Sequence, residues 1–237
     1  MSVDVLLIPG LLCDHRLWSG QTRILADIAC GRTPELTAHS IGAMADAVLS
    51  AAPEQFALAG FSMGGCVALE IAARVPSRVR RLGLLSTSAT GLLPNVRQHY
   101  QESIARIEAG GLDRYLADAF PRYVAPARVR DRSIWQTFFA MGSDLGGAVA
   151  VRQMRALLDY QGFRGDLRAI VCPTMLICGA EDQRTPVAVH EEMAGQIMGA
   201  KLTVIEGSGH FTPLENPAAV AGALRQWLQM QSAPPSP

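Results

Sequence analysis

The stretch G-F-S-M-G-G at residues 60–65 lies between an apolar run, Phe56–Phe61, and a segment of small residues, Met63–Val75. The first has the composition of a buried strand and the second that of a helix. A serine between them must sit in a sharp turn, and the flanking glycines remove the clashes that such a turn would create. The turn exposes the Ser62 hydroxyl beside a helix N-terminus, where unpaired N–H groups favour negative charge. The stretch therefore predicts a nucleophilic serine.

A serine hydroxyl needs a base to remove its proton at neutral pH. Of the five histidines, His210 lies in a glycine-rich segment directly after an apolar run, Lys201–Ile205. The carboxyl ends of parallel strands meet at one edge of a sheet, so a loop after such a strand lies near Ser62. His210 is therefore the predicted base. His15, which lies near the end of the first apolar run, stays open as an alternative.

The base in turn needs a carboxylate that orients it and stabilises its charged form. Glu181 and Asp182 both follow the apolar run Thr174–Cys178. Asp182 is preferred because its distances along the chain from Gly179 and Pro186 suit a loop that turns into the next helix. Glu181 remains the alternative.

Strand-like and helix-like segments alternate along most of the chain, which is typical of parallel βαβ units. We expect an α/β fold with a mostly parallel sheet of about six strands flanked by helices. The predicted strands are Val3–Ile8, Phe56–Phe61, Arg81–Leu85, Thr174–Cys178 and Lys201–Ile205, and the predicted helices outside the insertion described next are Ser40–Ala52, Met63–Val75 and Pro217–Met230.

The alternation stops between Thr90 and Arg168, where the sequence predicts helices around Val96–Glu108, Leu112–Ala119 and Ala148–Leu158. Helices inserted between two strands of a parallel sheet are expected to cover the edge where the strands end. We therefore predict a core of residues 1–89 and 169–230, a helical cap of residues 90–168, and a flexible proline-rich tail at 231–237. The insertion has more arginines than acidic residues, which is interpreted as a solvated surface, with a preference for anionic substrates as the alternative.

Composition excludes several classes of function. The 237 residues include 21 basic and 21 acidic side chains, and this balance argues against nucleic-acid binding. The five cysteines form no C-x-x-C pair, which argues against a disulfide framework or a metal site and favours a reducing cytoplasm. There is no apolar run long enough for a membrane span and no signal-peptide pattern, so a cytoplasmic location is predicted.

These segments together resemble the α/β-hydrolase fold, in the esterase-like group that includes enol-lactone hydrolases, pimeloyl-carrier methyl esterases and cofactor-free haloperoxidases. The matching pieces are Leu6–Gly10, Gly60–Gly65, Gly179–Pro186 and Gly207–His210, and the order serine, aspartate, histidine is that of the family. The resemblance implies an oxyanion hole made by the backbone N–H groups of Leu11 and Met63. It also implies catalysis without a metal or an organic cofactor.

The expected reaction is hydrolysis of a carboxylic ester through an acyl-enzyme intermediate, with a small-molecule ester as the partner and no prediction of oligomeric state. An apolar run at residues 135–141 suggests an acyl pocket for small to medium chains, although packing within the cap would also explain it. The predicted pocket residues are Leu12, Trp135, Phe138, Phe139 and Phe211. Hydrolysis of a lactone, thioester or C–C bond, perhydrolase or haloperoxidase activity, and a non-catalytic ligand-binding module remain alternatives.

Overall fold

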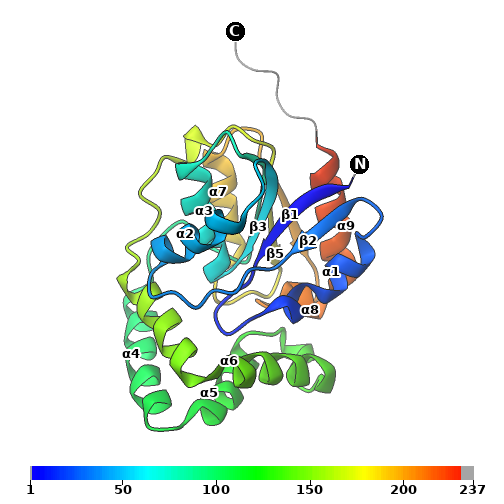
Figure 1. Cartoon of the computed structure of the whole chain (residues 1–237). Coiled ribbons are helices and arrows are strands. Elements are labelled where there is room, and N and C mark those ends of the chain that lie inside the picture. The colour runs from blue at the N-terminus through cyan, green and yellow to red at the C-terminus, as the bar shows by residue number, and fades with distance from the viewer. Residues whose placement is uncertain (1, 231–237) are drawn as a thin grey trace.

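Six parallel strands form one sheet at the centre of the part of the protein that the structure describes (Figure 1). The structure is a computed structural model that describes residues 2–230, so the tail predicted at 231–237 lies outside the described residues. The strands run in the order β2-β1-β3-β4-β5-β6 across the sheet. Their bounds are Val3–Ile8 (β1), Ala29–Arg32 (β2), Phe56–Phe61 (β3), Val79–Leu85 (β4), Thr174–Gly179 (β5) and Lys201–Ile205 (β6).

The prediction of an α/β fold with about six strands is confirmed, and three strands differ in detail. Strand β5 ends at Gly179 rather than Cys178. Strand β4 begins at Val79 rather than Arg81, because Val79 pairs with Phe56 at the start of β3. Strand β2 was not predicted from the sequence. Its four residues lie at the edge of the sheet and are mostly exposed. Such a strand shows neither a continuous apolar run nor a clear alternation of apolar residues.

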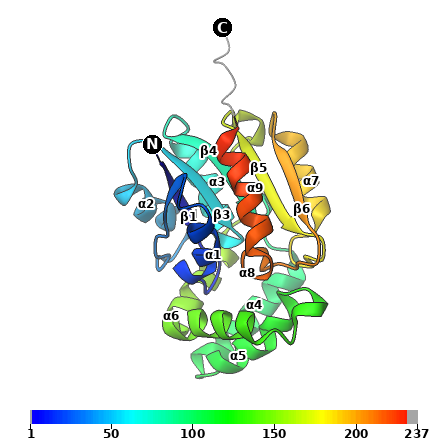
Figure 2. The ribbon, with the colours of Figure 1, turned by 90° about the vertical axis from the view of Figure 1, so that its right-hand side faces the viewer.

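Helices cover both faces of the sheet (Figures 1 and 2). Leu6 and Ile8 of β1 belong to a core shared with α2, α3 and α7, whereas Val5 and Leu7 face a core that includes residues of α9. This alternation follows from the two-residue period of a strand. The bounds of the flanking helices are Ser19–Ile24 (α1), Ile41–Ala51 (α2), Met63–Arg74 (α3), Val187–Gln196 (α7), Thr212–Glu215 (α8) and Pro217–Gln229 (α9).

Three further helices connect β4 to β5 and lie beyond one end of the sheet (Figures 1 and 2). These cap helices are α4 (Pro94–Glu108), α5 (Leu112–Ala119) and α6 (Arg132–Asp159). Helix α6 is interrupted at Gly146 by a positive φ of 79°, and the predicted helix around Ala148–Leu158 is the part of α6 after this interruption. The part of α6 before Gly146 was not predicted as a helix. The division of the chain into a core and a functional cap stays a prediction.

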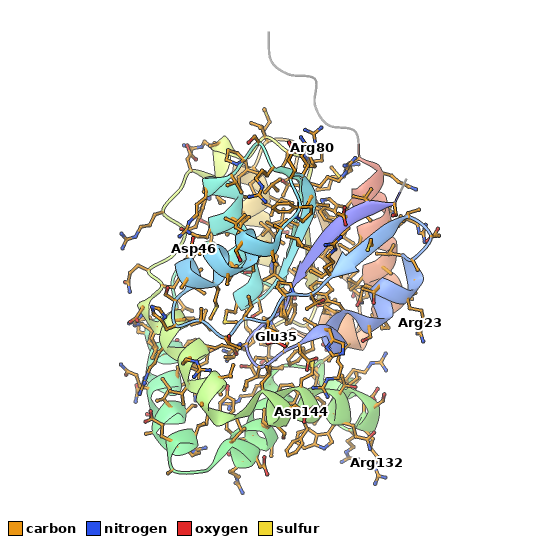
Figure 3. All side chains as sticks on the ribbon, viewed as in Figure 1. Arg23, Glu35, Asp46, Arg80, Arg132 and Asp144 are labelled. Atoms are coloured by element: carbon orange, nitrogen blue, oxygen red, sulfur yellow. The ribbon has the colours of Figure 1, made fainter. Side chains whose placement is uncertain are left out.

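Short 3-10 turns complete the described chain at His15–Trp18, Phe120–Arg122, Pro126–Arg128 and Leu167–Ala169. Figure 3 shows labelled charged side chains, such as Arg23 and Arg132, on the outside of the ribbon. Within residues 2–230, no helix combines the length and the apolar character that crossing a bilayer requires.

Candidate active site

The turn between β3 and α3 holds Ser62 in a conformation that L-residues rarely adopt, with φ 52° and ψ −116°. Gly64 is required here, because a Cβ on it would meet the carbonyl oxygens of Ile8 and Pro9. The Thr87 hydroxyl donates a hydrogen bond of 2.8 Å to the Ser62 carbonyl. The strained turn is thus held by close backbone packing and by a side chain two residues after β4, and the Ser62 side chain stays half-buried.

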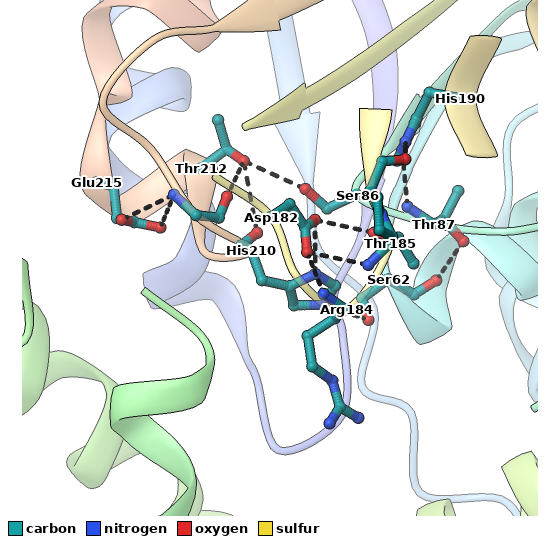
Figure 4. A network of polar contacts seen from close by, with 12 residues as sticks. Ser62, Ser86, Thr87, Asp182, Arg184, Thr185, His190, His210, Thr212 and Glu215 are labelled. Carbon is teal, nitrogen blue, oxygen red and sulfur yellow. Dashed lines mark hydrogen bonds and ion pairs between the residues drawn. The ribbon is translucent and has the colours of Figure 1, made fainter. Parts of the chain in front are cut away.

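Ser62, His210 and Asp182 form a continuous chain of hydrogen bonds (Figure 4). The distances are 2.9 Å from His210 Nδ1 to Asp182 Oδ2 and 2.9 Å from His210 Nε2 to Ser62 Oγ. An ionised carboxylate only accepts hydrogen bonds, so Nδ1–H donates to Asp182. In a neutral imidazole Nε2 then accepts from the Ser62 hydroxyl. The arrangement can therefore take a proton from the serine.

Asp182 is held as an anion although it is buried. Its Oδ1 accepts hydrogen bonds from the backbone N–H groups of Arg184 and Thr185, and its Oδ2 accepts one from the Thr185 hydroxyl. Burial by itself would raise the pKa of Asp182, but the charge on His210 and these hydrogen bonds outweigh it and lower the pKa to about 2. The carboxylate is therefore ionised over the whole neutral range.

The alternatives left open by the sequence are placed elsewhere. The Glu181 side chain is exposed, and its backbone N–H donates to the Ser208 carbonyl. The His15 side chain is 76% exposed and lies 3.8 Å from Asp14. Of the candidate acids and bases, only Asp182 and His210 are hydrogen-bonded into the chain that reaches Ser62.

His190 is buried next to this chain and has a different role. Its Nε2 accepts a hydrogen bond of 3.2 Å from the Thr87 N–H, and its Nδ1 donates to the Pro186 carbonyl. Burial lowers the pKa of His190. A neutral His190 therefore fixes Thr87, which in turn holds the Ser62 turn.

Glu215 holds the loop that carries His210. Both of its carboxylate oxygens accept from the Gly209 N–H at 3.0 Å, and Oε2 also accepts from the Ala125 N–H at 2.7 Å. Burial raises the pKa of Glu215, and the hydrogen bonds act in the opposite direction. The sequence argument assigned no role to Glu215. Its signal is an acidic residue in the otherwise uncharged segment 211–224.

The two predicted oxyanion donors both lie on the cavity beside Ser62. Within residues 2–230, neither the Leu11 N–H nor the Met63 N–H donates a hydrogen bond to another residue. The next residue, Leu12, has φ 56° and donates its N–H to Gln153 Oε1 at 2.8 Å. Both N–H groups are therefore available to a ligand. The loop after β1, which carries Leu11 and Leu12, is fixed to the cap helix α6 by the hydrogen bond from Leu12 to Gln153.

A cavity of about 360 Å³ extends from Ser62 and His210 toward the cap helices. Of the five residues predicted for a substrate pocket, Leu12, Phe138 and Phe211 line this cavity, whereas Trp135 and Phe139 do not. The rings of these two pack against each other at 5.1 Å, and the Trp135 ring also packs against Phe120. Helix packing within the cap, the alternative interpretation, accounts for both side chains.

The polar residues of the cavity wall that the sequence argument did not select include Tyr100, Tyr115, Tyr123 and Arg184. They come from α4, α5, the segment after α5 and the loop after β5, so no spacing along the chain connects them. Arg184 alone had a local signal, because it lies two residues after Asp182. Among residues 2–230 there is no cluster of three or more His, Cys, Asp or Glu side chains that could hold a metal ion.

The fold and this site define a class of α/β enzymes with a serine at the turn after a central strand. The chain belongs to the alpha/beta hydrolase family, whose pattern matches residues 5–223. It is therefore a hydrolase.

Curated relatives and solved structures agree with this assignment. The chain is 28% identical over 241 residues to the pimeloyl-[acyl-carrier protein] methyl ester esterase of Aromatoleum aromaticum, with 90% of this chain and 93% of that protein covered. Among solved structures it is similar to a malate-bound thermophilic esterase from Thermogutta terrifontis (TM-score 0.87, 24% identity, 97% and 90% covered). It is also similar to the enol-lactonase of Burkholderia xenovorans (TM-score 0.86, 18% identity, 97% and 92% covered). These two structures share the fold.

Proposed function

We propose that the protein is a serine esterase that cleaves carboxylic esters of small to medium acyl chain. The observation that carries the proposal is the chain of 2.9 Å hydrogen bonds from Asp182 through His210 to Ser62, which ends at the cavity. A buried carboxylate, an oriented imidazole and an accessible hydroxyl are the groups that activate a serine for attack on a carbonyl carbon. The names of the esterase relatives support the choice of an ester as substrate.

In the proposed reaction Ser62 Oγ attacks the ester carbonyl carbon while His210 Nε2 takes the hydroxyl proton. The Leu11 and Met63 N–H groups donate to the developing oxyanion, and each such donor contributes roughly 10²–10³ in rate. The C–O bond of the ester then breaks, and the leaving alcohol takes the proton from His210. Water, activated by the same imidazole, attacks the acyl-enzyme and releases the acid and the free serine.

The size of the cavity supports small to medium acyl chains. Its volume of about 360 Å³ is near the lower end of the 300–1,000 Å³ typical of ligand pockets. Apolar side chains such as Leu12, Phe138 and Phe211 form part of its wall. An acyl chain of a few carbons fits between them, whereas a long chain would have to extend out of the cavity.

The test is hydrolysis of p-nitrophenyl esters, from acetate to dodecanoate, by the wild type, Ser62→Ala and Ser77→Ala. Ser77 is an exposed serine that does not line the cavity, so its replacement is the matched control. We expect an optimum below octanoate, a loss of roughly 10³-fold or more in kcat for Ser62→Ala, and a change of less than about twofold for Ser77→Ala. Activity that persists in Ser62→Ala would overturn the assignment of the nucleophile. A rate that rises through dodecanoate would overturn the assignment of chain length.

A further inference from the structure

Arg184 is a positive charge on the cavity wall, and no carboxylate among residues 2–230 pairs with it. Within residues 2–230 its guanidinium forms no ion pair, and its one hydrogen bond is donated to the Tyr100 hydroxyl at 3.2 Å. A guanidinium has five N–H donors. Most of its hydrogen-bonding capacity is therefore available to a molecule in the cavity.

Other half-buried arginines donate to carboxylates or to backbone carbonyls. Arg16 pairs with Asp14 and Asp144. Arg78 has no ion pair, but its guanidinium donates to the carbonyls of residues 52, 53 and 54. Arg184 has neither kind of acceptor within residues 2–230, and a half-buried charge costs free energy unless it is paired.

Aromatic rings surround the Arg184 guanidinium in place of acids. Its Cζ lies 5.0 Å from the centre of the Tyr123 ring and 5.9 Å from that of Tyr100, and both distances are in the range of cation–π contacts. Burial raises the pKa of Tyr100 and of Tyr115, so their hydroxyls are neutral and can donate hydrogen bonds. The surroundings thus stabilise a cation while leaving its charge uncompensated.

The position of Arg184 connects this charge to the proposed reaction. Its backbone N–H binds Asp182, while its side chain points away from Ser62 and His210 in Figure 4. The Tyr123 ring lies next to both His210 and the Arg184 side chain, since its centre is 5.6 Å from the centre of the His210 ring and 5.0 Å from Arg184 Cζ. A single substrate in the cavity can therefore contact Ser62 at one end and Arg184 at the other.

We propose that Arg184, with the hydroxyls of Tyr100 and Tyr115, binds a free carboxylate of the substrate, so that the preferred substrates are esters that carry a second, ionised carboxyl group. This inference rests on the proposed esterase function. One guanidinium beside the neutral phenols of Tyr100 and Tyr115 matches a single negative charge, and its planar fork matches the two oxygens of a carboxylate. Hydrolysis then consumes one water and releases an alcohol and an acid, while the bound carboxylate is unchanged.

The kinetic test compares charged with uncharged esters. Monomethyl esters of dicarboxylic acids from malonic to suberic acid place the carboxylate on the acyl side, acetate esters of hydroxy acids place it on the alcohol side, and the corresponding methyl diesters are the uncharged references. For the best chain length we expect a kcat/KM at least about tenfold above that of the uncharged ester. Arg184→Gln should lose roughly tenfold to hundredfold on the charged ester and less than about twofold on the uncharged one.

Two variants control for folding and net charge. Arg184→Lys keeps the charge without the planar fork and should retain part of the preference. Arg130→Gln removes an exposed arginine of the cap region that does not line the cavity, and it should change neither rate. Equal rates on charged and uncharged esters in the wild type, or an equal loss on both in Arg184→Gln, would overturn the inference.

A binding measurement separates this inference from the proposed function. Dicarboxylates from succinate to suberate are titrated calorimetrically, at constant ionic strength, into the wild type, Ser62→Ala and Arg184→Gln. Binding that survives in Ser62→Ala and is lost in Arg184→Gln supports the carboxylate site even if no ester is cleaved. No binding to the wild type, binding that persists in Arg184→Gln, or tighter binding of inorganic phosphate than of any dicarboxylate would overturn it.

Discussion

The Leu12 N–H donates a 2.8 Å hydrogen bond to Gln153 Oε1, and this contact joins the loop after β1 to the cap helix α6 across 141 positions of sequence. Gln153 is 1% exposed, and its Nε2 donates to the Leu36 carbonyl at 2.7 Å. A single buried amide therefore ties two core loops to the cap. One of these loops carries the Leu11 N–H that we propose as an oxyanion donor.

Replacing Gln153 should lower the rate of the chemical step more than substrate binding. Gln153→Leu leaves the buried Leu12 N–H and Leu36 carbonyl without partners, at a cost of about 1–3 kcal/mol each, and releases the loop. We expect kcat to fall roughly tenfold, a fraction of the effect of removing a donor outright, with a smaller change in KM. Steady-state kinetics and the thermal midpoint Tm provide the measurements.

Two further variants make the Gln153 result specific. Gln153→Glu keeps an acceptor for Leu12 but loses the donor to Leu36, so it should lower Tm while retaining more of kcat than Gln153→Leu. Arg155 lies on the same helix as Gln153 and forms an exposed ion pair with Glu108 of α4. Arg155→Gln breaks this pair and should leave both kcat and Tm nearly unchanged. Equal loss of kcat in the Glu and Leu variants would contradict the idea that the contact with Leu12 matters for catalysis.

Glu215→Gln tests how the His210 loop is held. A glutamine has one amide oxygen in place of two carboxylate oxygens, and its NH₂ group cannot accept from Gly209 or Ala125. An amide oxygen at the position of Oε2 still accepts from both N–H groups, but the acceptor has lost its charge and the NH₂ group faces the Gly209 N–H, donor against donor. This change should lower the free energy of unfolding by about 1–3 kcal/mol. Chemical denaturation measures this loss. We expect a parallel decrease in kcat, because Gly209 precedes His210, and a variant of wild-type stability and activity would show that the loop does not depend on Glu215.

The pKa of Asp182 predicts a stability that depends on pH. It is about 2 in the folded protein against an ordinary value of 3.8, so the native state favours the ionised form. The associated stabilisation, about 2 kcal/mol, is fully present above about pH 4 and is lost as the pH falls toward 2. Asp182→Asn cannot titrate, so its Tm should lie below that of the wild type at pH 5, with a gap that narrows toward pH 2.

Glu181→Gln is the matched control for the aspartate, because it removes the adjacent but exposed carboxylate. It should follow the wild-type dependence of Tm on pH. At pH 7 Asp182→Asn should also lose about 10⁴ in kcat, since the amide no longer fixes the tautomer in which Nε2 accepts the serine proton. A constant difference in Tm between the wild type and Asp182→Asn from pH 5 to pH 2 would contradict the lowered pKa.

The sequence predicted the parts of the site that short segments define. Ser62 lies in a turn whose glycines are visible within six residues, and Asp182 and His210 each follow an apolar run that became a strand. The cavity wall depends instead on how α4, α5 and α6 pack over the sheet. Trp135 and Phe138 lie one helical turn apart and have similar chemistry, yet only Phe138 lines the cavity. The direction in which each ring points is set by tertiary contacts.

Gln153 and Arg184 illustrate a second limit. Each is a common polar residue whose role depends on partners far away in sequence, such as Leu12 for the amide and Tyr100 for the guanidinium. A single sequence shows a glutamine inside a helix and an arginine inside a loop, and both are ordinary surface residues by type. Their partners became visible only when the chain was folded.

Two glycines in different surroundings allow a final prediction about the Ser62 turn. In Gly64→Ala the new Cβ would meet the carbonyl oxygens of Ile8 and Pro9, the backbone directly before the proposed oxyanion donor at Leu11. Backbone atoms cannot move aside as a side chain can, so we expect a large loss of stability, of about 3 kcal/mol or more, and loss of activity in the fraction that folds.

In Gly222→Ala nothing lies within 4 Å of the new Cβ in helix α9, and alanine favours the helix by roughly 0.5–1 kcal/mol. The second variant should raise Tm by a few degrees at unchanged kcat. Thermal unfolding and ester hydrolysis of the two variants, side by side, measure how tightly β1 and the serine turn are packed, and a Gly64→Ala protein with wild-type Tm and kcat would show that this close approach is not needed.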